Sequence, residues 1–396
     1  MATRTLNRLT GREVVIVEAA RTPIGRGHAE KGWFKDVHPN ALLGAAYAAV
    51  LERSGIDPAL VDDVVAGAVS QVGEQSNNIA RNAWLQAGLP VTTPAVTIDR
   101  QCGSAQSAVS FAAAMIASGA ADVMIGAGVE HMGRVPMGSN VAHADELGTP
   151  YPPELMERYA LIPQGLSAEL IADTWGISRT EQDELGLRSH RLAAQAVAEG
   201  RFDREIVPVA VSGGETVTAD QGVRTDTSLE ALAKLRPAFK EGGTVTAGNS
   251  SQISDGAAAV LLMAREKADA LGLVPRARIA DHTTVGVDPV IMLTGPIPAT
   301  RRLLDRNGLT VGDIDLFEIN EAFASVVGAW RAELEPDMAR VNVNGGALAL
   351  GHPLGSSGAR LITTILHELE RSGGELGLVT MCTAGGTGTG TLLQRI

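Results

Sequence analysis

The stretch VTIDRQCGSAQSAVSFAAAMIASG, residues 96–119, predicts a short β-branched strand that turns into an alanine-rich helix, with Cys102 at the junction. A helix start offers N–H groups without intrahelical partners and about half a positive charge, and both favour a thiolate over a thiol. We expect this helix end to lower the pKa of Cys102 from about 8.5 by about one unit. A nucleophilic role for Cys102 therefore also requires a nearby base, since an isolated cysteine more often serves as a small apolar packing residue.

Length and composition restrict the class of protein. At 396 residues the chain can form two or three domains with large cores. Its formal net charge of -12 argues against a nucleic-acid or anionic-membrane surface, so any phosphate site must be a local basic pocket. The two cysteines, Cys102 and Cys382, provide no disulfide framework and are typical of a reducing compartment. No apolar run approaches about 18 residues, and the run at 14–17 is too short for a signal-peptide core, so we expect a soluble cytoplasmic protein without a membrane span.

The first third of the chain alternates strand and helix patterns. We expect strands at residues 13–18, 61–69, 95–99 and 122–129, and helices at 39–54, 78–87 and 103–118. This alternation predicts a mainly parallel sheet with helices on both faces. The pattern breaks between about residues 131 and 252, where an amphipathic segment at 180–200 lies among charged and proline-containing connections. We interpret this stretch as an inserted region, after which the α/β pattern resumes near residue 254.

An internal repeat relates the two ends of the chain. LERSGIDPALVDDVVAG at 51–67 matches LLDRNGLTVGDIDLFEIN at 303–320, with Leu304 opposite Leu51, so the offset is 304 − 51 = 253 residues. The same offset pairs the strand-like segments 121–129 and 374–382, and it pairs Cys102 with Gly355, which follows His352 by three residues. We therefore expect a duplicated α/β protein whose equivalent turns supply a cysteine and a histidine at a shared interface, where ligands often bind.

Three further side chains are candidates for chemistry. His352 lies among the glycines of VNVNGGALALGHPLGSSGAR (341–360), which let another group approach the backbone closely. Cys382 precedes the turn TAGGTG (383–388), and Asn320 stands where a strand ends and a helix begins. Each also has a structural explanation when taken singly, as a satisfied buried histidine, a strand-end thiol and a helix cap.

Taken together, six segments resemble the thiolase family over essentially the whole chain. The resemblance implies the thiolase fold, an α/β fold with duplicated βαβ-rich halves whose mixed sheets are covered by helices. It also implies an N-terminal half at 1–128 and 254–275, an inserted loop domain at 129–253 that binds coenzyme A (CoA), and a C-terminal half at 276–396. The segments, in family order and at family spacing, are VVIVEAARTPIGR (14–26), CGSA (102–105), TAGNSSQISDGAAAV (246–260), NEAF (320–323), residues 341–360, and CTAGGTGTG (382–390).

The resemblance also implies catalytic roles. Cys102 matches the nucleophile that becomes acylated, and His352 matches the base that takes its proton. Cys382 matches a second acid/base acting at the α-carbon of an acetyl thioester, a task that a thiol with a pKa near neutrality performs well. One oxyanion hole combines His352 with a water held by Asn320, and the other uses the main-chain N–H groups of Cys102 and Ala384. The implied reaction is reversible thiolytic cleavage of 3-ketoacyl-CoA to acetyl-CoA and a shortened acyl-CoA.

The family also implies ligands and partners. CoA, a substrate and not a tightly bound cofactor, is expected beside Arg224, Ala247 and Ser251, and an arginine suits a phosphate group on an acidic protein. Neither a metal nor a nucleic acid is expected. The resemblance further implies a homodimer or homotetramer, with an interface along the sheet edge of the N-terminal half.

Two departures from the family pattern limit what is carried over. Ala384 stands where many members have glycine, so its methyl group requires a negative φ. Pro163, Gln164 and Gly165 stand where short-chain biosynthetic thiolases carry His-Met-Gly. This segment approaches the acyl pocket, so acetoacetyl specificity is not carried over, and a short-chain acetoacetyl-CoA thiolase remains an alternative.

Other readings are less favoured. A ketoacyl-synthase-like condensing enzyme has no second catalytic cysteine, and sterol-carrier-type thiolases usually replace the asparagine at position 320 by histidine. A zinc site built from Cys102, Cys382 and His352 lacks the usual ligand spacing. A catalytically inactive scaffold is disfavoured because every motif residue is present. Finally, two cysteines in one site predict that mild oxidation joins Cys102 to Cys382 and stops activity.

Overall fold

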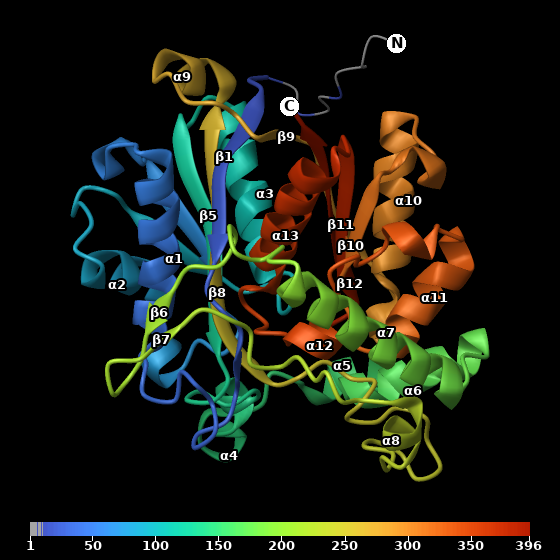
Figure 1. Cartoon of the computed structure of the whole chain (residues 1–396). Coiled ribbons are helices and arrows are strands. Elements are labelled where there is room, and N and C mark those ends of the chain that lie inside the picture. The colour runs from blue at the N-terminus through green and yellow to red at the C-terminus, as the bar shows by residue number, and fades with distance from the viewer. Residues whose placement is uncertain (1–5, 7–8, 10) are drawn as a thin grey trace.

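A computed structural model describes residues 6, 9 and 11–396, and a ten-stranded sheet runs through the molecule (Figure 1). Its strands are hydrogen-bonded to their neighbours in an order that passes from the N-terminal to the C-terminal half. That order is β4 (Ala95–Ile98), β3 (Asp63–Gly67), β5 (Val123–His131), β8 (Ser254–Ala264), β1 (Val14–Arg21), β9 (Ala277–Gly286), β12 (Thr387–Arg395), β11 (Leu376–Thr383) and β10 (Leu316–Ile319), with β2 (Gly25–Arg26) paired to β8.

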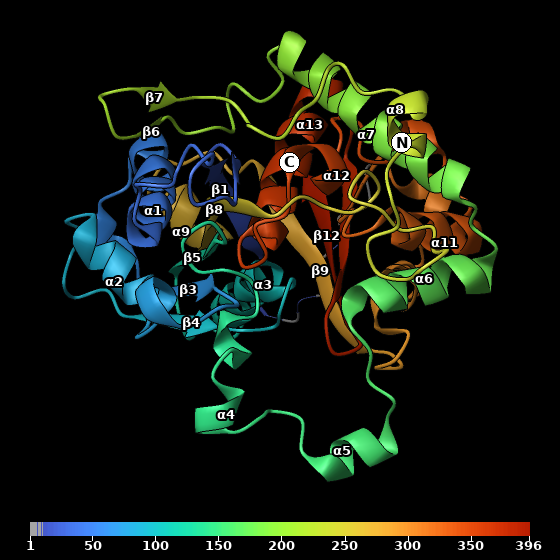
Figure 2. The same ribbon diagram turned by 90° about the horizontal axis from the view of Figure 1, so that it is seen from below.

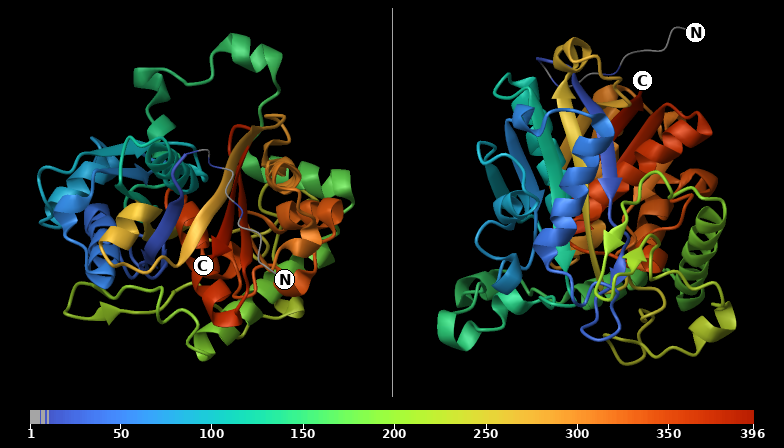
Figure 3. Two further views of the ribbon diagram at one scale, coloured as in Figure 1. Left: turned by 90° about the horizontal axis from the view of Figure 1, so that it is seen from above. Right: turned by 60° about the vertical axis from the view of Figure 1, so that its left-hand side comes forward.

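Helices lie on both faces of the sheet, as predicted. The helices α3 (Ser104–Ala117) and α13 (Ser357–Ser372) lie at the centre, and their core cluster takes residues from both halves (Figures 1 and 3). A second core lies under the outer helices of the N-terminal half, and a third lies under those of the C-terminal half. These outer helices are α1 (Pro39–Ser54) and α2 (Ile79–Gln86) on one side, and α10 (Pro296–Asn307) and α11 (Ala324–Leu334) on the other.

The predicted parallel arrangement is correct for only part of the N-terminal half. Strands β3, β4 and β5 pair in parallel, but β1 pairs antiparallel with both β8 and β9. The prediction of a mainly parallel sheet is therefore wrong for β1. The reason is that β8, an entirely buried strand from beyond the inserted region, takes the place between β1 and β5. Residues Val15 and Ile16 of β1 also reach β9, so the two halves share one continuous sheet.

The internal repeat is visible in the structure. Helix α3 begins at Ser104 and α13 at Ser357, which keeps the offset of 357 − 104 = 253 residues. A side-chain contact is repeated as well. Asp62 accepts main-chain N–H groups of residues 122 and 123 at 2.7 and 2.9 Å, while Asp315 accepts those of 375 and 376 at 2.8 and 2.9 Å. Each aspartate thus anchors the start of the strand that follows its central helix.

The segment between β5 and β8, residues 132–253 and here called the insert, leaves the sheet. Strand β5 continues to His131, past the predicted start of the loop domain at residue 129. Figure 2 shows α4 and α5 on a protruding arm, whereas α6 and α7 pack against α11 and α12 of the C-terminal half. The elements are α4 (Ala144–Leu147), α5 (Pro153–Arg158), α6 (Gln164–Trp175), α7 (Arg179–Ala198), β6 (Val209–Ala210), β7 (Thr216–Val217) and α8 (Leu229–Ala233).

Two short helices complete the C-terminal connections, α9 (Arg265–Ala270) after β8 and α12 (Ala347–Leu350) before α13. The predicted amphipathic segment at 180–200 corresponds to α7, which starts with a capping box formed by Ser178 and Glu181. Within the described part of the chain, every helix is too short or too polar to cross a membrane.

Candidate active site

Cys102 lies in the tight turn between β4 and α3. The turn depends on Gln101, which has a left-handed φ of 49° and whose N–H donates to the Asp99 carboxylate at 2.6 Å. Gly103 then permits close packing, because an added Cβ would lie 2.6 Å from Cγ2 of Thr383. The turn that carries Cys102 therefore rests directly on the chain that follows Cys382.

The sulfur of Cys102 is buried. Burial raises the pKa of its thiol to about 12, and the charge of Glu130 adds to the rise. The backbone N–H groups of Ala384 and of Cys102 itself, and the side chain of Gln164, oppose it. The prediction that the helix end lowers this pKa is therefore wrong, because desolvation of the thiolate outweighs the N–H groups. Cys102 stays a thiol at neutral pH until a base removes its proton.

Cys382 lies near the end of β11, before a turn in which Gly385 and Gly386 have φ values of 79° and 75°. Ala384 is not among the residues with positive φ, so its backbone meets the condition that its methyl group imposes. Burial raises the pKa of the Cys382 thiol well above its usual range, and the neighbouring Cys102 raises it further. The predicted value near neutrality is therefore wrong, and both cysteines are free thiols.

His352 is buried and held in one tautomer. Its Nδ1 lies 2.6 Å from Oγ of Ser357, and that hydroxyl donates to the carbonyl oxygen of Pro353 at 2.9 Å. Because the hydroxyl hydrogen is used in this way, Nδ1 carries the imidazole hydrogen and Nε2 is the acceptor. Nε2 lies 3.2 Å from Nδ2 of Asn320. Burial lowers the pKa of His352 to about 3, and the Arg360 charge adds to the effect, so the imidazole is neutral.

Asn320 joins this imidazole to the strand beside Cys382. Its main-chain N–H donates to the carbonyl oxygen of Thr380 at 3.0 Å, two residues before Cys382 on β11. The side chain is fully buried, and its Oδ1 has no hydrogen-bond partner among the residues that the structure describes. Leaving such an acceptor unpaired is costly, so this position fits the water that the family resemblance predicts beside His352.

The carboxylate of Glu130 links the active-site loops of the two halves. It accepts main-chain N–H groups of Val69 and Ser70 at 2.9 and 3.1 Å, and that of Gly355 at 2.9 Å. Gly355 is also held by close contact, because a Cβ added at Gly128 would lie 2.0 Å from its carbonyl oxygen. The sequence analysis did not single out Glu130. The one sign of its role is that it is an acidic residue in an otherwise apolar strand. The turns before α3 and α13 lie side by side, since a Cβ added at Gly67 would lie 2.6 Å from Cβ of Ser104 and 2.7 Å from the carbonyl oxygen of Gly355.

The predicted CoA residues lie beside α7. Arg224 is exposed, and its main-chain N–H donates to Nδ1 of His190 at 3.1 Å. Ala247 is exposed in a turn that packs on the same helix, since an added Cβ at Gly186 would lie 2.6 Å from the carbonyl oxygen of Gly248. Positions 186 and 190 are one helical turn apart, so both predicted residues lie along one face of α7.

Ser251 is next in the chain to residues that contact the backbone of His352. It is half-buried, and its N–H donates to the carbonyl oxygen of Ala322 at 2.9 Å. The next residues contact the histidine backbone, because the N–H of His352 lies 3.2 Å from the Gln252 carbonyl oxygen and 3.1 Å from Oγ of Ser254. The three predicted CoA residues thus extend from the exposed Arg224 to Ser251, which is close to the backbone of His352.

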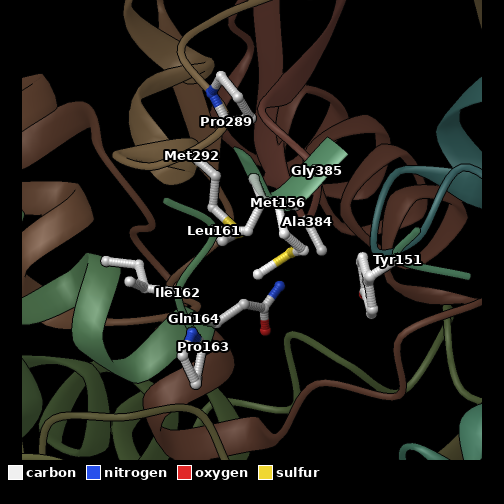
Figure 4. Close-up of a pocket in the computed structure, with 10 residues that line it drawn as sticks. All are labelled: Tyr151, Met156, Leu161, Ile162, Pro163, Gln164, Pro289, Met292, Ala384 and Gly385. Carbon is white, nitrogen blue, oxygen red and sulfur yellow. The ribbon is translucent and has the colours of Figure 1, made fainter. Parts of the chain in front are cut away.

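An apolar cavity of about 410 Å³ opens between Gln164 and Ala384, which follows Cys382 by two residues (Figure 4). It is bounded by the insert on one side and by the turn after Cys382 on the other. The sequence singles out the segment around Gln164 as divergent and near the acyl pocket, and the structure places Gln164 in the lining of this cavity. The lining residues are Tyr151, Met156, Leu161, Ile162, Pro163, Gln164, Pro289, Met292, Ala384 and Gly385.

The zinc alternative finds no support in the side-chain geometry. In the described part of the chain, no group of three or more histidine, cysteine, aspartate or glutamate side chains is arranged to hold a metal ion.

Comparison with known families identifies the chain. The family model of the thiolase N-terminal domain matches residues 14–266, and that of the thiolase C-terminal domain matches residues 273–395. The chain belongs to the thiolase family. Its similarity to the Bacillus anthracis acetyl-CoA acetyltransferase is structural as well, with a TM-score of 0.90 and 38% identity over 98% of this thiolase and 100% of that chain.

Individual relatives span nearly the full length of this thiolase. It is 48% identical to the steroid 3-ketoacyl-CoA thiolase of Mycobacterium tuberculosis, covering 97% of this chain and 94% of that protein. It is 45% identical to the 3-ketoacyl-CoA thiolase of Hahella chejuensis, with 98% and 100% covered, and 43% identical to the acetyl-CoA acetyltransferase of Syntrophomonas wolfei, with 97% and 100% covered. The family, fold class and enzyme class predicted from the motifs are confirmed.

Proposed function

We propose that this thiolase cleaves 3-ketoacyl-CoA with CoA to acetyl-CoA and a shortened acyl-CoA, and catalyses the reverse condensation, through an acyl-Cys102 intermediate. One observation carries the proposal. The N–H groups of Cys102 and Ala384 both favour the Cys102 thiolate, Cys382 is its neighbour, and the start of α3 packs against the His352 loop, where an added Cβ at Gly358 would lie 2.3 Å from the Gln106 nitrogen. A nucleophile, its oxyanion donors and a second acid/base thus share one buried site.

Cleavage begins at the 3-keto carbon. Nε2 of His352 takes the proton of the Cys102 thiol, and the thiolate attacks that carbon to form a carbon–sulfur bond. The bond between C2 and C3 then breaks, and the enolate of acetyl-CoA leaves with the electron pair. The Cys382 thiol donates its proton to C2, which gives acetyl-CoA and a Cys382 thiolate. The remaining acyl group is bound to Cys102 as a thioester.

Transfer of the acyl group completes the cycle. The Cys382 thiolate takes the proton of incoming CoA, whose sulfur attacks the acyl-Cys102 carbonyl. Cys102 leaves as a thiolate and recovers its proton from the His352 imidazolium, so both cysteines return to the thiol form. This order of events predicts ping-pong kinetics, with one product released before CoA reacts.

Two sets of donors stabilise the negative oxygens. We propose that the N–H groups of Cys102 and Ala384, which both favour the Cys102 thiolate, hold the oxygen of a carbonyl attached to its sulfur. We propose that Asn320, with its water, and His352 hold the thioester enolate oxygen of acetyl-CoA. Each fixed donor in such a site contributes about 3 kcal/mol to the barrier reduction.

We propose acyl groups larger than that of acetoacetyl-CoA as substrates. The cavity beside Ala384 and Gln164 has a volume of about 410 Å³ and a mostly apolar lining, which suits a long or ring-bearing acyl chain. The name of the Mycobacterium tuberculosis relative, a steroid 3-ketoacyl-CoA thiolase, agrees with this size.

We propose that the loop domain at residues 129–253 binds CoA. This domain is inserted between two segments of the N-terminal half, 1–128 and 254–275, and the C-terminal half follows at 276–396. Arg224 would contact a phosphate, while Ala247 and Ser251 would contact the chain leading to the reactive sulfur. Support comes from their common face along α7 and from the short path between Ser251 and His352. CoA acts as a substrate in this scheme, and no tightly bound cofactor is needed.

A second copy of the chain is the proposed protein partner, in a homodimer or homotetramer. Strand β4 is the edge of the sheet in the N-terminal half, and Val91 and Val96 beside or within it are 75% and 45% exposed. An open edge with apolar side chains favours pairing with another chain. The two free thiols favour a cytoplasmic location.

The proposed reaction is tested by CoA-dependent cleavage of acetoacetyl-CoA compared with longer and ring-bearing 3-ketoacyl-CoAs. We expect higher kcat/KM for the larger substrates and no measurable turnover by Cys102→Ala. Unchanged turnover in that variant would overturn the role of Cys102, and a preference for acetoacetyl-CoA would overturn the proposed substrate class.

A further inference from the structure

Glu321 is a buried acidic residue, next to Asn320, that the proposed reaction does not use. It is 4% exposed, and its carboxylate accepts three hydrogen bonds from neutral donors. The Ser189 hydroxyl donates to Oε2 at 2.6 Å, the Leu348 N–H donates to the same oxygen at 3.1 Å, and Nδ2 of Asn342 donates to Oε1 at 2.9 Å. Both carboxylate oxygens are therefore paired, which offsets much of the cost of burying a charge.

The hydroxyl of Ser189 ties α7 to the chain that leads to His352. Ser189 is fully buried on α7, and its Oγ also accepts the Gly346 N–H at 3.0 Å. The contact is close, because an added Cβ at Gly346 would lie 2.3 Å from Cδ of Glu321. Gly346 immediately precedes α12, and His352 follows that helix. The carboxylate and the hydroxyl therefore hold the start of α12 against the insert.

The side chain of Asn342 extends this link to the strand that ends before Asn320. Asn342 is fully buried and has a left-handed φ of 45°, a conformation that asparagine tolerates better than most residues. Its Oδ1 accepts the Ile319 N–H, and its Nδ2 donates to the Ile319 carbonyl oxygen, both at 2.9 Å. Asn320 thus stands between two residues, Ile319 and Glu321, that are both hydrogen-bonded to Asn342.

We propose that Glu321 is a positioning residue, which holds Asn320 and the segment before His352 at the separation that the reaction needs. This inference rests on the proposed function, in which Asn320 and His352 hold the enolate oxygen of acetyl-CoA. Nδ2 of Asn320 lies 3.2 Å from Nε2 of His352, and the Glu321 carboxylate is bonded to the segments that carry both side chains. Misplacement by about 1 Å in such a site can lower the rate about 10²-fold. Glu321 acts only through these two side chains.

Helix α7 has a second anchor to the C-terminal half that does not involve Glu321. Nη2 of Arg188 donates to the carbonyl oxygens of Met338 and Val341 at 2.5 and 2.8 Å. Because this anchor remains when the Glu321 carboxylate is changed, α7 should stay docked, and the proposed CoA face beside Arg224 should keep its place. Loss of the carboxylate is therefore expected to affect the reaction more than the binding of CoA.

The test compares kcat for thiolysis in Glu321→Gln and wild type with the Kd of CoA from calorimetry. Glutamine keeps the size of the side chain, but its NH₂ group faces a donor where the carboxylate offered an acceptor. We expect kcat to fall at least tenfold while the Kd changes less than twofold. The NMR signal of Nε2 of His352 should also shift, because Asn320 is its neighbour. Ser189→Ala removes one donor and should lower kcat by about threefold, and it decides by the same readings if Glu321→Gln does not fold.

Glu169→Gln is the matched control. Glu169 is a buried carboxylate of α6 that also accepts three hydrogen bonds, from the N–H groups of Thr244 and Val245 and from Oγ1 of Thr244. It should lower the urea midpoint of unfolding by a similar amount and leave kcat and the His352 signal unchanged.

Three results would overturn the inference. They are an unchanged kcat in the folded Glu321 or Ser189 variant, an unchanged His352 signal, and an equal fall of kcat in the control. The His352 signal and the Kd of CoA do not depend on turnover. Failure of the positioning role is therefore distinguishable from failure of the proposed reaction, which Cys102→Ala tests.

Discussion

The two halves of this thiolase share one fold and differ at equivalent turns. The turn before α3 carries Cys102, whereas the corresponding position before α13 is Gly355, with His352 three residues earlier. Asp62 and Asp315 make the same anchoring contacts in both halves, so the scaffold is repeated even where the chemistry is not. The two halves therefore contain two copies of one turn. The copy before α3, here called the nucleophile turn, carries Cys102, and the copy before α13, here called the base turn, carries His352.

Burial acts in opposite directions on the two turns. It raises the pKa of Cys102 to about 12 and lowers that of His352 to about 3, so both groups are neutral at physiological pH. A thiolate and an imidazolium would form together only when substrate brings further stabilisation. Substitutions in each half test this division of labour.

Removing the nucleophile should have the largest effect. Cys102→Ala leaves His352 and both oxyanion sites in place but removes the atom that accepts the acyl group. We expect kcat for thiolysis to fall by about 10⁴-fold or more. Steady-state assays at saturating CoA, with circular dichroism to verify folding, measure this loss. A fall of less than tenfold would mean that the N-terminal turn is not the nucleophile turn.

Removing the second cysteine should separate two steps. Cys382→Ala is expected to lower kcat for thiolysis by about 10² to 10⁴-fold, because the leaving enolate loses its proton donor. Transfer of an acetyl group from acetyl-CoA to Cys102 uses Cys382 only to protonate the departing CoA thiolate, which is a far better leaving group than an enolate, so this transfer should slow much less. Mass measurement of the acetylated protein tests this difference, and equal loss of both steps would contradict it.

Removing the asparagine amide should weaken one oxyanion site. Asn320 is fully buried and lies 3.2 Å from the His352 ring, so Asn320→Ala deletes a donor without opening the surface. We expect kcat to fall about 10²-fold with a smaller change in KM. Asn307→Ala, at a buried asparagine that contacts Asp281, is the matched control and should lower stability while sparing kcat. Equal losses of kcat in the two variants would argue against the assigned site.

Neutralising the link between the halves should have a smaller effect. Glu130→Gln turns an amide NH₂ toward N–H donors, and we expect a loss of about 1–3 kcal/mol in unfolding free energy and about tenfold in kcat. Glu169→Gln is the control, since Glu169 is a buried carboxylate that accepts N–H groups of Thr244 and Val245 within the insert. It should lose similar stability with little loss of kcat, and the same ratio of losses in both would contradict the linking role.

The smallest change is expected in the protonation of His352, in the base turn. Since the pKa of His352 is lowered to about 3, its imidazole should remain neutral as the pH falls from 8 through about 6.5, where an exposed histidine takes up its proton. Imidazole nitrogen NMR signals, assigned with His352→Asn, would report this directly. Protonation of His352 near pH 6.5 would show that the ring is solvated and not held as the structure has it.

Local signals predicted much of this fold. Helix α1 has the predicted bounds, 39–54, because Pro39 suits its first turn and Gly55 its end, where φ is 70°. The partners of β1 were not predictable, since β8 comes from the far side of the insert. Nor were the pKa directions of the two cysteines, because desolvation is a property of the assembled core. The contacts of Glu130 and Glu321 likewise depend on segments that only tertiary packing brings together.

The most direct test of the division between the halves is to find the acylated residue. Brief incubation with a 3-ketoacyl-CoA in the absence of free CoA, followed by acid quench, proteolysis and peptide mass spectrometry, identifies the thioester. The peptide containing Cys102 should carry the shortened acyl group, and His352→Asn should reduce its formation while leaving the protein folded. Acylation of Cys382 in place of Cys102, or acylation of Cys102 at an unchanged rate in the His352 variant, would contradict the assignment of nucleophile and base to separate halves.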